Sequence, residues 1–148
     1  MCIRDRLERG EELVSGASTS YDAYTRGDSL FTLSATPNQQ KKKTIAQAEA
    51  GLWRLLDELK AKPPTTEELE RIRAQVIAGV VYQRDSITSQ ATAIGSLETV
   101  GLSWKLMDTE LADLQSVTPE DIQKAARTYF TRERLSVAHV LPEETAHE

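Results

Sequence analysis

Two adjacent prolines, Pro63 and Pro64, constrain the fold most, because neither residue can lie inside a helix. Before them, residues 42–62 carry apolar side chains at helical spacing on one stripe: Ile45, Leu52, Leu55, Leu56 and Leu59. After them, Thr65 can cap a new helix while Glu68 reaches back to it, as in a capping box. The sequence therefore predicts two successive helices, the second ending near Arg84.

Three more helices are expected further along the chain. Residues 87–100 form the first, with Gly101 as its C-cap, and residues 104–115 form the second. The third begins at Thr118, whose cap is followed by Pro119 at the first helical position, and ends near residue 130. The inward faces expected after Pro64 are Leu69, Ile72, Val76, Val80; Ala91, Ile94, Leu97; Met107, Leu111, Leu114; and Ile122, Ala125, Ala126, Tyr129.

Three segments have the character of strands. Residues 13–24 and 30–35 flank a turn containing Gly27 and predict a hairpin. Residues 134–141 alternate Leu135, Val137, His139 and Leu141 and predict a third strand. The resulting class is α+β, an antiparallel sheet with helices packed on one face. Because three strands are few for so much helix, we expect an N-terminally truncated domain over residues 7–142, after a non-native or truncated start at 1–6 and before a tail at 143–148.

Charge and hydropathy exclude two classes of partner. The net charge is −5, and nucleic-acid binding calls for clustered basic side chains. No apolar stretch approaches the roughly 18 residues of a membrane-spanning helix. We therefore expect neither nucleic-acid binding nor membrane insertion.

Catalytic motifs are missing from the sequence. Neither H-E-x-x-H nor H-x-x-E-H occurs, the histidines are His139 and His147, and Cys2 is the single cysteine. The sequence therefore predicts no catalytic residue and no metal site in this chain. The Arg84-Asp85-Ser86 break leaves two interpretations open, a helix capped by Asp85 or Ser86, or a direct substrate contact by Arg84.

Four stretches together carry a family resemblance. They are SYDAYTRGDSLFTLSATP at 20–37, PPTTEELERIRAQVIAGVVYQRDS at 63–86, the segment 95–101 ahead of Trp104, and VTPEDIQKAARTYF at 117–130. In this order and spacing they resemble the C-terminal non-catalytic domain of insulinase-type zinc metallopeptidases, the group of pitrilysin and the mitochondrial processing peptidase, most closely its bacterial branch. The resemblance covers residues 7–142.

The resemblance implies an architecture and a role. In that family two halves enclose a chamber, and zinc belongs to the N-terminal catalytic half, so this chain would form chamber wall around a peptide substrate. The positions that hold the substrate backbone in some members are Glu8 and Ser15 here, and both differ from the Arg and Tyr of the family. The residues expected to contact substrate are Ser15, Ser18, Tyr21 and Arg84. A bacterial periplasm or envelope is the compartment that the resemblance suggests.

Two other functions compete with the chamber-forming domain. The first is an inactive partner subunit that scaffolds a separate zinc-bearing peptidase subunit. The second is an unrelated α+β interaction module. A zinc motif upstream in the same chain would favour the enzyme, and one in a neighbouring gene would favour the partner subunit.

Overall fold

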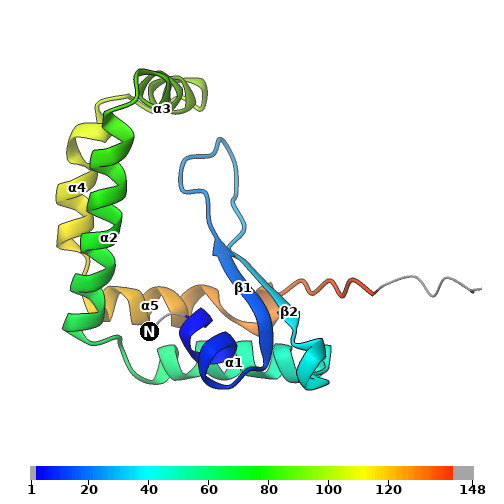
Figure 1. Cartoon of the computed structure of the whole chain (residues 1–148). Coiled ribbons are helices and arrows are strands. Elements are labelled where there is room, and N and C mark those ends of the chain that lie inside the picture. The colour runs from blue at the N-terminus through cyan, green and yellow to red at the C-terminus, as the bar shows by residue number, and fades with distance from the viewer. Residues whose placement is uncertain (1–2, 142–148) are drawn as a thin grey trace, which may run out of the picture.

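Helix α1 (Ile45–Ala61) forms the base of the molecule, and the other elements rise from it or lie along it. The computed structural model describes residues 3–141 (Figure 1). Helix α5 (Pro119–Tyr129) packs along α1, while β1 (Val14–Ser20) and β2 (Thr32–Pro37) form a hairpin that stands above it. A short π-helix, η1 (Asp5–Gly10), and a 3-10 turn, η2 (Gln39–Lys41), flank the hairpin in sequence.

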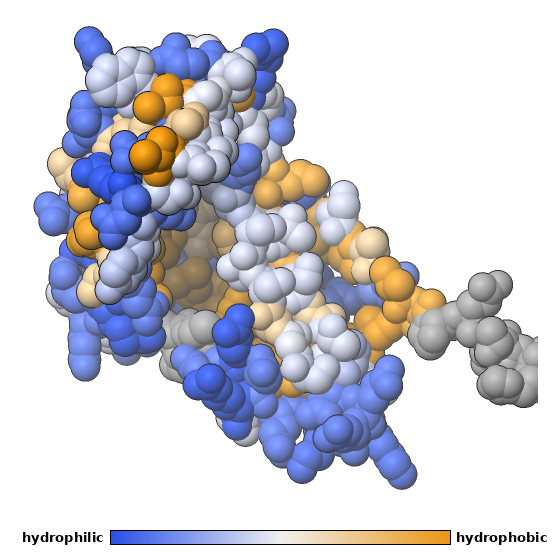
Figure 2. All heavy atoms as spheres, turned by 45° about the horizontal axis from the view of Figure 1, so that its top comes forward, coloured by the Kyte–Doolittle hydropathy of each residue, from blue (hydrophilic) through white to orange (hydrophobic). Residues whose placement is uncertain are grey.

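The other three helices form an arm beside the hairpin. Helix α2 (Thr66–Arg84) leads away from the base with α4 (Leu106–Ser116) alongside it, and α3 (Ile87–Thr99) crosses at the far end (Figure 1). Figure 2 shows that the surface is hollowed between this arm and the hairpin, with apolar side chains in the hollow. The molecule is therefore α+β, with helices against a small antiparallel sheet.

The core lies where η1, the hairpin and α1 meet. Leu7 and Val14 are fully buried and Ala48 is nearly so. Partly buried apolar side chains surround these three: Ile3, Leu13, Ala17, Ala35, Leu52 and Leu55. The predicted apolar stripe of α1 is confirmed here, since Leu52 and Leu55 pack on this cluster and Leu56 is buried as well.

Local capping interactions define the helix starts. Thr65 and Glu68 form the predicted capping box of α2, and Thr118 forms one with Asp121 at the start of α5. Gly101 has φ of +86°, the left-handed conformation expected of the residue that ends α3. The Ser86 hydroxyl accepts a bond from the Ser89 amide, which supports the capping interpretation of the break after Arg84.

The predicted third strand is wrong. Arg132–Arg134 forms a 3-10 turn, η3, and residues 135–141 have no regular structure. Within residues 3–141 the sheet has two strands, β1 and β2, and the closing segment has no ladder with either. Alternating apolar residues give a strand only where a neighbouring strand accepts its backbone hydrogen bonds, and residues 135–141 instead bring His139 to Glu49 of α1.

Several predicted inward faces are only partly buried. Leu69 and Leu97 are buried, but Ile72, Val76 and Ile94 remain about two-fifths exposed, and Tyr129 is 60% exposed. Among residues 3–141, α2 packs mainly on α3 and α4, and the exposure of Ile72 and Val76 shows that part of its apolar stripe is not covered. The two strands are also displaced from their predicted limits, since residues 21–24 and 30–31 belong to the connecting loop.

No helix in the described part of the chain combines the length and apolar character needed to cross a membrane.

Candidate functional site

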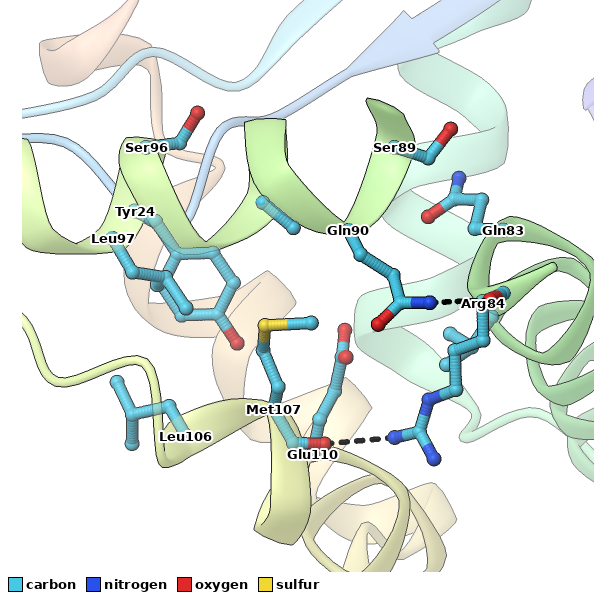
Figure 3. A pocket seen from close by; sticks show the side chains of 12 residues that line it. Tyr24, Gln83, Arg84, Ser89, Gln90, Ser96, Leu97, Leu106, Met107 and Glu110 are labelled. Carbon is cyan, nitrogen blue, oxygen red and sulfur yellow. Dashed lines mark hydrogen bonds between the residues drawn. The ribbon is translucent and has the colours of Figure 1, made fainter. Parts of the chain in front are cut away.

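A pocket of about 230 Å³ lies at the far end of the arm, where α2, α3, α4 and the hairpin loop meet (Figure 3). Its apolar wall includes Val80, Leu97, Leu106 and Met107. The polar side chains around it are Tyr24, Gln83, Arg84, Ser89, Gln90, Ser96 and Glu110. The pocket thus combines an apolar interior with several convergent polar groups, which is the general character of binding sites.

Arg84 connects the three helices that form the pocket. It is the last residue of α2, and its guanidinium donates a hydrogen bond of 2.9 Å to the carbonyl oxygen of Met107 near the start of α4. Its own carbonyl oxygen accepts a 2.7 Å bond from the Gln90 amide on α3. Arg84 is therefore a positioning residue for the pocket as well as part of its wall.

The hairpin loop closes the pocket on the remaining side. Arg26 donates from its guanidinium to the carbonyl oxygen of Thr99 at the end of α3, and Tyr24 points into the pocket. Partial burial raises the pKa of the Tyr24 hydroxyl, and the negative charges of Glu110 and Asp113 raise it further. The pocket therefore has an acidic character at the place where the Tyr24 hydroxyl lies.

The four predicted contact residues fall into two places. Ser15 and Ser18 lie exposed on β1, and the Ser15 hydroxyl donates to the Thr36 carbonyl oxygen at 3.4 Å. Tyr21 is 61% exposed just after β1, with its ring centre 6.4 Å from that of Phe31. These three do not line the pocket, whereas Arg84 does.

Sequence reasoning missed Tyr24, Met107 and Glu110 as members of one site. Tyr24 was assigned to a strand and Met107 to a helix core, so neither assignment suggested a pocket. The available signal concerns Tyr24, because the Asp22 carboxylate accepts a hydrogen bond from the Tyr24 amide and turns the chain there, as aspartate often does in loops.

The described residues do not fit a zinc site. No group of three or more His, Cys, Asp or Glu side chains within residues 3–141 is placed to hold a metal ion. His139 is exposed, with its Nε2 atom 3.3 Å from a carboxylate oxygen of Glu49. Cys2 and His147 lie outside the described residues.

A second, shallow surface lies on α1 around Trp53. The guanidinium carbon of Arg132 is 3.6 Å from the centre of the Trp53 ring, and the Lys60 ammonium is 5.3 Å from it. The contact of Arg132 holds η3 against α1, whereas Lys60 lies on α1 itself. The lining is open and charged, so we interpret this surface as structural.

Comparison with known proteins gives matches among solved structures alone. No protein-family profile matches the sequence, and no curated protein matches it significantly. A structure from Bordetella parapertussis, described as the inactive peptidase domain of a "putative zinc protease", aligns with 93% of this chain and 72% of its own, with a TM-score of 0.80 and 22% identity. The chain has the fold of that peptidase domain. A "putative zinc protease" from Bordetella pertussis Tohama I aligns with 84% of this chain and 67% of its own, with a TM-score of 0.69 and 20% identity.

Proposed function

We propose that this chain is the C-terminal, non-catalytic domain of a bacterial insulinase-type zinc metalloendopeptidase, where it forms part of the chamber that encloses peptides. The observation that carries the proposal is the fold match over 93% of the chain to a domain described as inactive. The four sequence stretches that resemble the insulinase type support the narrower assignment within peptidase folds.

The shape of the molecule suits a wall rather than a catalytic centre. The surface between the arm and the hairpin is hollowed and holds apolar side chains (Figure 2). Ser15, Ser18 and Tyr21 are exposed on or just after β1. Such a surface can meet an extended peptide without reacting with it. Enclosing a substrate also excludes folded proteins and bulk water from the place of reaction.

Catalysis on this proposal belongs to an N-terminal half, in the same chain or in a separate subunit. Zinc bound there would polarise the scissile carbonyl and activate a water molecule. The described residues of this chain would contribute binding and enclosure, because they lack a group of side chains that could hold the metal.

An inactive partner subunit that scaffolds a separate zinc-bearing subunit is the second candidate. The inactive peptidase domain from Bordetella parapertussis is compatible with this candidate, because a catalytically inactive half can act beside a zinc-bearing half that is a separate subunit. The two candidates differ in where the zinc motif is encoded. An unrelated interaction module, the third candidate, predicts no zinc motif in the same or the adjacent reading frame.

The deciding experiment begins with the source locus on both sides of the codons for this chain. We expect an H-x-x-E-H motif either upstream in frame or in the adjacent gene. The encoded zinc half is then expressed with and without this chain and assayed on an unfolded fluorogenic peptide. Cleavage that requires both parts supports the proposal, whereas full cleavage without this chain, or the absence of any such motif, contradicts it.

A further inference from the structure

We propose that the pocket between α2, α3, α4 and the hairpin loop receives the side chain of a lysine or an arginine from a bound peptide. That the ligand is a peptide rests on the proposed function. The preference for a long cationic side chain is argued from the pocket itself. Three properties carry it: the size of the pocket, its apolar wall and its charge.

The size of the pocket suits one side chain. Its volume of about 230 Å³ is smaller than the roughly 300 Å³ at which pockets for whole small molecules begin. The pocket lies where the arm meets the hairpin loop, and the hollow in which an extended peptide would lie is between the same two parts of the chain (Figure 2). A single side chain can therefore enter while its backbone stays outside.

The wall of the pocket suits an aliphatic stem. Leu97 is only 5% exposed, and Val80, Leu106 and Met107 are partly buried around it. Lysine and arginine bury their methylene groups along such surfaces and keep the charged end near polar groups. Methionine adapts to stems of different shape, because it is unbranched and flexible.

The charge of the pocket suits a cation. Glu110 lines it, and among the described residues the Glu110 carboxylate has no ion pair or side-chain hydrogen bond. Together with Asp113 it makes the surroundings of the Tyr24 hydroxyl negative. Arg84 is the one basic side chain among the described residues that line the pocket. Its guanidinium donates to the Met107 carbonyl oxygen, so the Glu110 carboxylate remains available to an incoming ammonium or guanidinium group (Figure 3).

A peptide series tests the preference directly. The isotope-labelled 148-residue chain is titrated with blocked pentapeptides whose central residue is lysine, norleucine or glutamate, and the amide shifts of Leu97 and Met107 report occupancy. Norleucine keeps the stem and lacks the charge. We expect the lysine peptide to bind about three- to fivefold more tightly than the norleucine peptide, as for a solvent-accessible ion pair.

Variants locate the charge that is responsible. Glu110→Gln keeps the shape of the pocket and should make the lysine and norleucine peptides bind equally. Glu120→Gln, on α5 at the base, makes the same change in net charge and should leave the preference intact. Equal binding of lysine and norleucine by the unmodified chain, tighter binding of the glutamate peptide, or an unchanged preference in Glu110→Gln would overturn the proposal.

Failure of the proposed function would look different. As a probe without a peptide backbone, n-butylammonium carries only the stem and the charge of a lysine side chain. If no zinc-bearing half is encoded at the locus but n-butylammonium and the lysine peptide still change the amide chemical shifts of Leu97 and Met107, the pocket is a cation site in a protein of another class. If the zinc half requires this chain but neither probe shifts these amides, the chamber role stands and the pocket proposal is refuted.

Discussion

Gly51→Ala tests the packing of α1 against the first part of the chain. Gly51 is buried in the middle of α1. A β-carbon there would lie 3.0 Å from Cδ1 of Leu13 and 3.2 Å from Cδ2 of Leu7. Leu13 is partly exposed, so its side chain can shift. Leu7 is fully buried, so its side chain cannot move away from the added methyl group without displacing other core side chains. The added methyl group therefore overpacks the core cluster.

Two opposing effects set the magnitude. Alanine in place of glycine inside a helix stabilises it by about 0.8–1.0 kcal/mol. Overpacking a well-filled core costs roughly 1–3 kcal/mol. Because the clash involves a leucine without free space, we take the middle of that range and expect a net loss of about 1 kcal/mol in the free energy of unfolding.

Gly79→Ala is the matched control. Gly79 lies in α2, and a β-carbon there would meet nothing within 4 Å, so the full helix gain of about 1 kcal/mol is expected. The two variants should then differ by about 2 kcal/mol, which corresponds to roughly 4–8 °C in Tm for a chain of this length. Thermal unfolding followed by circular dichroism measures the difference. If Gly51→Ala melts as high as Gly79→Ala, the described contact between η1 and α1 is wrong.

Three further predictions follow from the base and from the helix caps. Leu55→Asp places an unpaired charge against the core cluster and should cost about 3 kcal/mol or more, so an unchanged melting curve would show that the face is misassigned. Hydrogen bonds from the hydroxyl and amide of Thr118 hold the pKa of Asp121 below its usual 3.8. Because the folded-state pKa is lowered, this contribution to stability is present above that value and is lost as the pH falls through the folded-state pKa. Thr118→Val should raise the Asp121 pKa in an NMR titration and weaken the acid dependence of unfolding, and a pKa that does not move would contradict the assignment. Finally, elemental analysis of the purified 148-residue chain should find no stoichiometric zinc, and one tightly bound zinc per chain would contradict the assignment of the metal to another half.

Helix starts could be predicted from the sequence because their causes are local. Each of the two capping boxes, at Thr65 and Thr118, is made by one hydroxyl and one carboxylate three residues apart, and the prolines at 63, 64 and 119 restrict the backbone conformation at their own positions. The α1 stripe was also predictable, since one continuous pattern matched one buried face. The Thr65 and Thr118 predictions depend on nothing outside their own turn, which is why they are confirmed.

The errors concern contacts between distant parts of the chain. The alternation at 134–141 predicts a strand, but a pattern cannot supply the neighbouring strand that would accept its hydrogen bonds. Ile72 and Val76 follow helical spacing, yet their exposure depends on which element packs against α2. The pocket was hidden for the same reason, because it unites a loop tyrosine with side chains about 60 to 90 residues away.

The stacking of Arg132 on Trp53 gives the protein a built-in optical probe. The guanidinium of Arg132 lies 3.6 Å from the centre of the Trp53 ring, so the ring is in a different electrostatic environment from a tryptophan ring in water. The fluorescence emission of Trp53 therefore depends on whether η3 is docked on α1. The other tryptophan, Trp104, is 45% exposed near the start of α4 and supplies a separate signal that Trp104→Phe would remove. The remaining fluorescence then follows detachment of the segment after α5 without any label. Docking at the base can thus be measured separately from events at the pocket.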